Sequence, residues 1–312
     1  MAKKRKIIFA YRAHQSQMGS TVMRVHQLSE MLRTWQGDEF EVETVGIPRK
    51  RFHRRHRAFA EYAKDAIVVG LKFAISDMDP ESVSLLRENA RALCLDHVDS
   101  VPTEDTLPLY DVHIMASHEG RKKMERRLKA SGAPYSAVMH VTHHADPRLP
   151  SSNPRSDDRF SICYLGNPKN MVEASEIVEV LPYMEKGFFF CAKLLAHYPA
   201  HYGVRTRSHS REVSKPFTKG FTAAAMNANI IVDRSTDDAH FYLGSDYPFL
   251  LPDNHPNTVL AGLEHMRLSY GGAEWKHGLD IMKSVRHLSS PRHIISELVM
   301  ALDVAEAISA LR

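Results

Sequence analysis

The sequence predicts an α/β protein made of two successive units, each a parallel β-sheet covered by helices. Short apolar segments alternate with amphipathic helical segments along most of the chain. The length of 312 residues exceeds the roughly 250–300 residues at which one hydrophobic core usually stops growing. A proline-rich polar segment at 146–158 interrupts the alternation, which then restarts. We therefore predict two domains, residues 1–150 and 151–312.

The first half begins with a strand, a glycine-containing loop and a helix. Lys6–Tyr11 is a short apolar run, and apolar residues then recur at helical spacing from Thr21 to Trp35, where Ser20 or Thr21 can cap the helix. The later elements alternate in the same way: strands at 41–47, 66–75, 111–117 and 136–142, and helices at 80–93 and 119–130.

The second half repeats this order. Its predicted elements are a strand at 160–165, a helix at 172–180, a strand at 187–194, a helix at 217–226 and a strand at 229–233. From Val259 onward the pattern is helical, with turn signals at 271–272 and 289–291. We expect the last helix to pack back on the first domain.

Composition excludes several protein classes and indicates a compartment. With 43% hydrophobic and 25% charged residues, the chain is not a collagen, a coiled coil, a disulfide scaffold or a long disordered protein. The formal charge of 41 − 37 = +4 gives no support for nucleic-acid binding. No apolar stretch is long enough for a signal peptide or a spanning helix, and the three cysteines are far apart. We therefore expect a cytoplasmic protein.

The segment 215–233 is the most informative for chemistry. A loop with Lys215, Thr218 and Lys219 opens an alanine-rich helix, which leads into a strand. A helix N-terminus offers free N–H groups and partial positive charge, and the lysines add full charges. This arrangement can hold a diphosphate, but the same spacing also fits a solvated basic helix start.

This segment resembles the donor-binding segment of bacterial GT-B glycosyltransferases. Residues 19–28 are similar to the glycine loop and first helix of their acceptor domain, and residues 164–169 resemble the first strand and turn of their donor domain. Arg205 and the segment 238–246 also fit this order. The Glu-x7-Glu pattern common in retaining members is absent, and 215–225 occupies its place, so the stereochemical outcome stays open.

The resemblance implies two Rossmann-like domains that face a cleft, with a nucleotide-sugar bound mainly by the second. The residues implied on the donor side are Gly166, Asn167, Arg205, Lys215, Thr218 and Lys219. It also implies that cations, not a bound metal, neutralise the diphosphate, so neither a metal nor another cofactor is expected. The Asp77-Met-Asp79 pair has metal-ligand spacing, but it precedes a helix at Pro80, which favours a helix-start acid cluster.

On the acceptor side the resemblance points to Gly19, Ser20 and Arg24. Gly19 and Ser20 lie in the loop after the first predicted strand, where ligands of parallel sheets bind. Arg24 lies one turn into the helix. It either reaches a phosphate or is a solvated helix residue, and the sequence slightly favours the solvated residue.

Histidines supply the candidates for proton transfer or sugar binding. His118 follows one predicted strand, and His143 and His144 follow another near the domain boundary. As a zinc site the 140–146 segment is weak, because no fourth ligand has suitable spacing. For each of the three histidines a structural role is the commoner alternative.

The basic run Arg49–Arg57 is usually read as a solvated loop or helix face. The resemblance to GT-B glycosyltransferases, whose acceptor domains often carry basic membrane-binding surfaces, also implies peripheral contact with anionic lipids on the inner face of the plasma membrane. Aromatic residues are nearly absent from this run, so base stacking with single-stranded nucleic acid is not supported. The resemblance implies a hexosyltransferase that moves a sugar from a nucleotide donor to an acceptor hydroxyl. The expected acceptor is a glycan or lipid-linked precursor in cell-surface polysaccharide or glycolipid synthesis. The alternatives are a sugar-nucleotide epimerase of the same fold and a non-catalytic protein that binds nucleotide-sugar or glycan.

Overall fold

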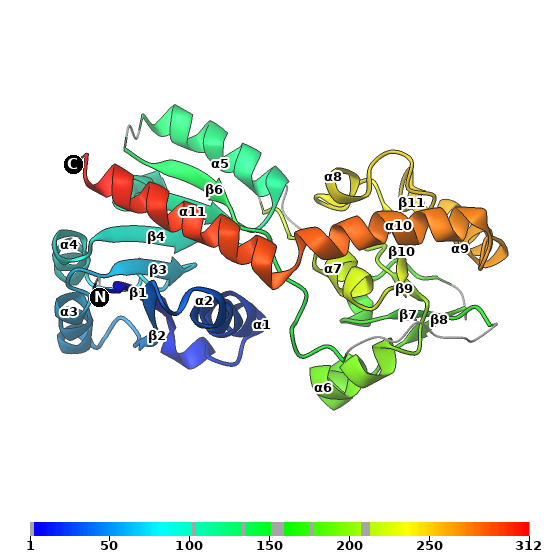
Figure 1. The fold of residues 1–312 in the computed structure, drawn as a ribbon, viewed down its shortest axis with the longest axis horizontal. Coiled ribbons are helices and arrows are strands. Elements are labelled where there is room, and N and C mark those ends of the chain that lie inside the picture. Colours follow the sequence, from blue (N-terminus) through cyan, green and yellow to red (C-terminus); the bar gives the residue numbers. More distant parts are fainter. Residues whose placement is uncertain are drawn as a thin grey trace. The chain divides into compact units, whose positions relative to one another are not determined.

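The computed structural model describes residues 3–101, 104–132, 135–150, 159–174, 177–206 and 213–311, without the side chain of Asp105. Contacts divide the chain into two compact units (Figure 1). Unit 1 comprises Met1–His143, Glu212–Pro216 and Pro291–Arg312, and unit 2 comprises His144–Arg211 and Phe217–Ser290. Most of the predicted linker, residues 151–158, lies outside the described residues.

Unit 1 contains a parallel sheet with strand order β2-β1-β3-β4-β5-β6 among its described residues. Its strands are β1 Arg5–Arg12, β2 Phe40–Ile47, β3 Ile67–Leu71, β4 Ala92–Asp96, β5 Val112–Met115 and β6 Ala137–His140. Successive side chains of β1 enter different cores, Ile7 and Phe9 one and Ile8 and Ala10 the other. Because both faces of the sheet are covered, the central strands β3 and β4 are buried along their whole length and almost entirely apolar.

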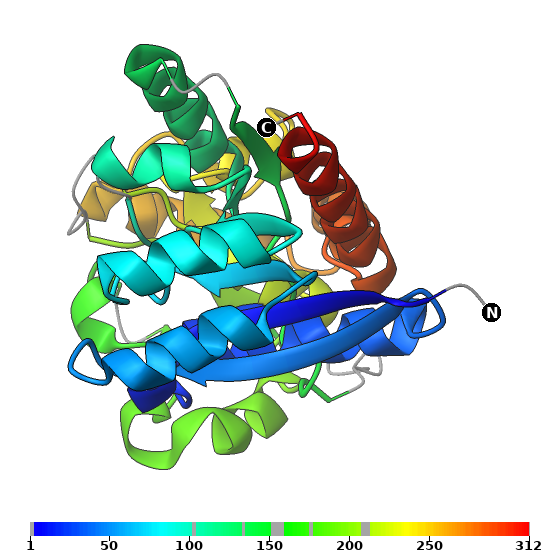
Figure 2. The same cartoon turned by 90° about the vertical axis from the view of Figure 1, so that its left-hand side faces the viewer.

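Helices cover both faces of this sheet (Figure 2). The helical segments are η1 Ala13–Gln15, α1 Gly19–Thr21, η2 Val22–Gln27 (a π-helical stretch), α2 Leu28–Gln36, α3 His53–Tyr62, α4 Pro80–Asn89, η3 Glu104–Leu109, α5 His118–Ser131 and α11 Pro291–Ser309. Helices α2 and α11 pack on one face, and α3 and α4 pack on the other. The last helix of the chain, red in both views, thus completes the core of unit 1.

Unit 2 has a parallel sheet with strand order β11-β10-β9-β7-β8 and one continuous core. Its strands are β7 Ile162–Tyr164, β8 Val178–Val180, β9 Ala200–Tyr202, β10 Asn229–Asp233 and β11 Leu250–Leu251. Its helices are η4 Pro168–Asn170, α6 Tyr183–Leu195, α7 Thr218–Ala225, α8 Ala239–Leu243, α9 Pro256–Leu268 and α10 Ala273–Leu288. The predicted fold class, two Rossmann-like α/β domains, is confirmed by these two parallel sheets.

Two predicted elements of unit 2 are wrong. Residues 178–180 form strand β8, not the end of a helix, because their backbone pairs with β7. Residues 187–194 lie in helix α6, not in a strand. In that apolar run Cys191 is buried while Phe189 is exposed, so the segment has a buried and an exposed side. A short apolar run fits a strand or a helix equally well until its partners are known.

Two elements of unit 1 are shorter than predicted. Helix α4 ends at Asn89, and the residues that follow form the buried strand β4 instead of continuing the helix. Strand β3 ends at Leu71, and Lys72 has a φ of 52°, which turns the chain out of the sheet. The predicted helix at 80–93 therefore includes the start of strand β4, and the predicted strand at 66–75 includes a turn.

Candidate functional site

In unit 2, β8 lies on one side of β7 and β9 lies on the other. The carboxyl ends of β7 and β9 therefore form a topological switch point, the position where open α/β sheets bind ligands. Gly166 follows β7, Arg205 follows β9, and Lys219 lies in the first turn of α7. Three of the predicted donor-side residues thus come together at this edge.

Lys219 is partly buried between groups that cannot neutralise its charge. Its Nζ donates a hydrogen bond to the Leu165 carbonyl and lies 3.7 Å from the centroid of the Tyr164 ring. Burial, and then repulsion from Arg205, lowers the pKa of Lys219 from 10.5 to about 7. Within the described ranges neither Lys219 nor Arg205 pairs with a carboxylate. The site therefore has an uncompensated positive charge, which suits an anionic ligand.

Gly166 leaves the space beside this ammonium open. Its φ is +145°, a conformation that side chains rarely adopt. A Cβ at this position would lie 3.3 Å from Lys219 Nζ and 3.3 Å from the Tyr164 hydroxyl oxygen. Both the backbone conformation and the space therefore favour glycine at the turn after β7.

The remaining predicted residues of unit 2 have local roles. Asn167 caps η4 by accepting a hydrogen bond from the Lys169 N–H at 3.1 Å, so its side chain is engaged in the turn. Thr218 begins α7, and its carbonyl accepts a bond from the Thr222 hydroxyl at 2.9 Å. The carbonyl of Arg205 accepts a bond from the Asn254 amide at 2.9 Å, which fixes the backbone that carries the guanidinium.

Lys215 does not share a unit with Lys219. Contacts place Lys215 in unit 1, where the preceding residue, Ser214, accepts a hydrogen bond from Lys123 Nζ of helix α5 at 2.8 Å. The two lysines of the predicted loop are therefore anchored separately. That both neutralise one diphosphate stays a prediction.

In unit 1, the predicted acceptor-side residues differ in exposure. Gly19 and Ser20 begin α1, and Gly19 is exposed. Arg24 is 1% exposed; its Nε lies 2.7 Å from Asp96 Oδ2, and Nη1 donates to the Thr142 carbonyl at 3.1 Å. The interpretation of Arg24 as a solvated helix residue is wrong, because the π-helical stretch η2 is packed on the sheet and Asp96 at the end of β4 supplies a buried counter-charge.

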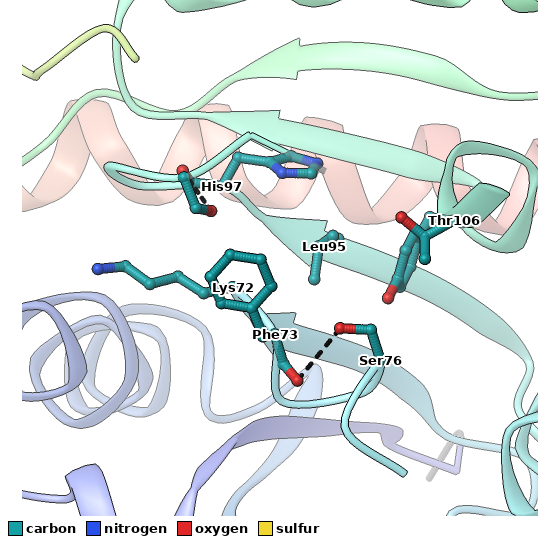
Figure 3. A pocket seen from close by; sticks show the side chains of 8 residues that line it. Lys72, Phe73, Ser76, Leu95, His97 and Thr106 are labelled. Atoms are coloured by element: carbon teal, nitrogen blue, oxygen red, sulfur yellow. Dashed lines mark hydrogen bonds between the residues drawn. The ribbon is translucent and has the colours of Figure 1, made fainter. Parts of the chain in front are cut away.

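A pocket opens at the carboxyl ends of β3 and β4 in unit 1. Figure 3 shows the His97 ring on one side of Leu95, with Phe73 and Ser76 on the other. The residues lining it are Lys72, Phe73, Ser76, Leu95, His97, Ser100, Thr106 and Tyr110. The side chain of Lys72 extends away from Leu95 and Thr106.

Two buried polar atoms of the pocket residues have no partner among the described residues, His97 Nδ1 and the Tyr110 hydroxyl. His113 Nε2 lies 3.0 Å from the Leu107 carbonyl, which can only accept, so Nε2 carries the His113 proton. His113 Nδ1 is then the acceptor for His97 Nε2 at 2.7 Å. His97 Nδ1 is left as a hydrogen-bond acceptor, because burial first, and then His113, keeps the pKa of His97 well below 6.5.

Neither His97 nor Tyr110 is among the residues predicted from the sequence. The signal that identifies His97 is its place directly after a buried strand, and this strand was merged into a helix. Tyr164, whose ring lies against Lys219, belongs to the segment 164–169 but has no predicted role of its own.

The three predicted catalytic histidines occupy buried or stacked positions. His118 begins α5 and stacks on His140 with ring centroids 3.8 Å apart. Burial, followed by His140, lowers the pKa of His118 to about 4. His143 and His144 are buried beyond the end of β6, and contacts assign them to different units. Their catalytic role stays a prediction.

The predicted membrane-contacting run leads from the end of β2 into helix α3. Arg54, Arg55 and Arg57 are exposed, and Arg57 pairs with Glu61 at 3.1 Å. None of the helices in the described ranges combines the length and the apolar composition that a membrane crossing requires.

Comparison with solved structures identifies the fold. A glycosyltransferase from Rickettsia africae aligns with a TM-score of 0.68 at 10% identity, over 97% of this chain and 99% of its own. A sucrose-phosphate synthase from Thermosynechococcus elongatus aligns with a TM-score of 0.61 at 12% identity, over 95% of this chain and 98% of its own. The chain has the GT-B glycosyltransferase fold. A lipopolysaccharide outer core galactosyltransferase also aligns, with a TM-score of 0.56 at 9% identity, over 96% of this chain and 99% of its own.

No protein-family model and no curated protein matches the sequence. The GT-B fold therefore rests on structure alone. Within it, the Lys219 and Arg205 cations lie in the second Rossmann-like domain, and the pocket with His97 lies in the first.

Proposed function

We propose that the protein is a glycosyltransferase that transfers a hexose from a nucleoside-diphosphate donor to an acceptor hydroxyl. One observation carries this proposal: beside Gly166, at the switch point of unit 2, Lys219 and Arg205 converge and pair with no carboxylate of the described residues. Lysine and arginine at such an edge are the groups that bind a diphosphate. The GT-B fold of the chain supports the same assignment.

The same cations supply the transition-state stabilisation in this proposal. Breaking the bond between the sugar and the diphosphate leaves additional negative charge on the departing oxygen, and fixed positive charge stabilises it. Lys219 must carry its proton to act in this way. A bound diphosphate therefore raises the pKa of Lys219 from about 7, because it supplies the missing opposite charge. We propose that this charge neutralisation needs no bound metal.

For the acceptor, we propose the pocket of unit 1. An acceptor hydroxyl donates to His97 Nδ1 and accepts from the Tyr110 hydroxyl, which satisfies both buried atoms. We place the acceptor among the glycans or lipid-linked precursors of cell-surface polysaccharide or glycolipid. This choice is supported by the structural similarity to a lipopolysaccharide outer core galactosyltransferase.

We further propose that the protein works at the inner face of the plasma membrane, held by the exposed arginines of the 49–57 run. Flotation with liposomes containing anionic lipid tests this contact. Replacing Arg54, Arg55 and Arg57 together by Gln should reduce binding, and equal binding by both proteins would exclude it.

Nucleotide binding followed by turnover tests the proposed function. Isothermal titration with UDP, GDP, ADP and dTDP selects the nucleotide, and the corresponding nucleotide-sugars are then incubated with and without candidate acceptors. A transferase releases the nucleoside diphosphate faster when an acceptor is present. An epimerase converts the sugar while the sugar stays attached to the nucleotide. A binding protein neither releases the nucleotide nor changes the sugar. Lys219→Met and Arg205→Met should abolish most binding, while the exposed Lys193→Met serves as the matched control. Unchanged binding in the first two variants would refute the donor site.

A further inference from the structure

Three possible metal ligands meet between helix α3 and the start of helix α4 in unit 1. His53 and His56 lie three positions apart in the first turn of α3, and Asp79 immediately precedes α4. His53 Nδ1 lies 3.3 Å from Asp79 Oδ2, and His56 Nδ1 lies 3.2 Å from the same oxygen. The three ligand atoms all lie within 4.8 Å of one another.

The tautomer of His56 makes this contact unfavourable without a cation. His56 is fully buried, and its Nε2 lies 3.0 Å from the Pro48 carbonyl oxygen, which can only accept. The proton of the neutral ring is therefore on Nε2, and the Nδ1 lone pair faces a carboxylate oxygen. Two acceptors 3.2 Å apart repel each other unless a cation lies between them. That cation is either a metal ion or a second proton on His56.

Asp79 is oriented for this role by the helix that it caps. Its Oδ1 accepts a hydrogen bond from the Ser82 N–H at 3.0 Å, so Oδ2 is directed to the histidines. The neighbouring acid of the predicted Asp-x-Asp pair, Asp77, instead pairs with Arg12 at 2.6 Å. One oxygen of Asp79 thus caps helix α4, and the other faces the two histidines.

The two distances from the histidines to Asp79 fit a tetrahedral ion. Metal bonds of about 2.0–2.1 Å to nitrogen and oxygen place neighbouring ligand atoms of a tetrahedron about 3.3 Å apart. The two contacts to Asp79 Oδ2, 3.2 and 3.3 Å, have this length. Metal-binding histidines usually donate the N–H of their other ring nitrogen to a carbonyl or carboxylate oxygen, which fixes the ring. His56 Nε2 makes this kind of contact with the Pro48 carbonyl.

We propose that His53, His56 and Asp79 bind a Zn²⁺-type divalent ion, with water in the fourth position. Imidazole with one carboxylate is a ligand set that zinc accepts. The exposed arginines beside it, Arg54 and Arg55, extend into solvent, where water and salt screen their charge. The ion ties the first turn of α3 to the start of α4 and so fixes the position of the 49–57 basic run on unit 1.

Titration of Zn²⁺ into the EDTA-treated full-length protein tests the site. We expect His53→Ala and Asp79→Asn to weaken the tightest Zn²⁺ site at least about tenfold. Both variants should fold, because His53 is exposed and asparagine caps helices as well as aspartate does. His14→Ala, an exposed histidine outside the cluster, is the matched control and should bind Zn²⁺ like the wild type.

A second readout separates a metal from a proton. Co²⁺ should give the visible absorption of a tetrahedral site in the wild type and in His14→Ala, and lose it in His53→Ala and Asp79→Asn. Equal Zn²⁺ affinity in all four proteins would overturn the proposal. It would also be overturned if nitrogen NMR showed both ring nitrogens of His56 protonated at neutral pH and unchanged by Zn²⁺. Neither result depends on nucleotide binding, so this site and the proposed function can fail separately.

Discussion

If Lys219 holds the diphosphate of the donor, as we propose, then diphosphate binding should depend on proton uptake. With a pKa of about 7 in the free protein, lowered by burial and then by Arg205, the amine is about 0.9 neutral at pH 8 and about 0.1 neutral at pH 6. A bound diphosphate requires the charged form. Lys219 should therefore take up about 0.9 proton per binding event at pH 8 and about 0.1 at pH 6.

Isothermal titration of the selected nucleoside diphosphate measures this uptake directly. At pH 8 the observed enthalpy in Tris and in HEPES should differ by the uptake times the difference in buffer ionisation enthalpy. The terminal phosphate has a pKa near 6 and is already ionised at pH 8, so it contributes little. The dissociation constant should also rise about tenfold per pH unit above pH 7, since less of the free protein holds the proton.

Lys219→Met removes both effects. A hydrogen bond to a charged group is worth about 1.5–3 kcal/mol, so binding should weaken about 10- to 150-fold at pH 6, where the lysine is charged. The variant should show no buffer-dependent enthalpy at pH 8, whereas Lys193→Met should behave like the wild type. Tight binding with no proton uptake in the wild type at pH 8 would refute the link between Lys219 and the diphosphate.

Three further predictions concern stability and the acceptor pocket. Gly166→Ala forces a side chain into a φ of +145°, so we expect a loss of about 1–3 kcal/mol in urea unfolding together with weaker nucleotide binding. Arg24→Met leaves the Asp96 carboxylate buried without its counter-charge, so the free energy of unfolding should fall by about 3–5 kcal/mol. Adding Asp96→Asn in a double-mutant cycle should restore most of this lost stability. Tyr110→Phe removes a hydroxyl that has no partner among the described residues, so the free energy of unfolding should change by less than about 0.5 kcal/mol. The KM for the acceptor should rise. A stability loss above 1 kcal/mol would show that this hydroxyl is bonded within the protein.

The pH dependence of stability gives a separate check on Lys219. In the unfolded chain its pKa is 10.5, so between pH 7 and 10.5 the unfolded state holds a proton that the folded state lacks. The contribution of this residue to stability therefore rises with pH across that window. Lys219→Met should be more stable than the wild type below pH 7, and the difference should shrink toward pH 10.5. A constant difference would contradict the lowered pKa.

The fold could be predicted where local pattern and burial agree. The run from Lys6 to Tyr11 is apolar because both faces of β1 are covered, and the helix after it keeps one buried side. The pattern failed at Ala92–Asp96, an apolar strand that begins three residues after helix α4 ends. It failed again in α6, because an apolar run of eight residues fits either structure.

Local signals also explain which parts of the site were predicted. Gly166 follows a strand and Lys219 opens a helix, and each feature is visible within a few residues of sequence. The pair of His97 and His113 depends on β4 lying beside β5, a pairing that no local window contains. Arg24 needs a partner 72 positions away, so the sequence could not show that it is buried.

Arg24 and Lys219 show how this chain treats a buried cation in two different ways. Arg24 has a carboxylate, Asp96, at 2.7 Å, and this pair joins η2 to the end of β4. Lys219 has a carbonyl and an aromatic ring, and a second cation close enough to lower its pKa. Burying a charge without an opposite charge costs free energy, and a fold selected for stability alone would replace Lys219 by an apolar residue or add an acid. That Lys219 stands at the switch point of unit 2, beside a glycine that keeps the space open, is best explained if an anionic ligand supplies the missing charge.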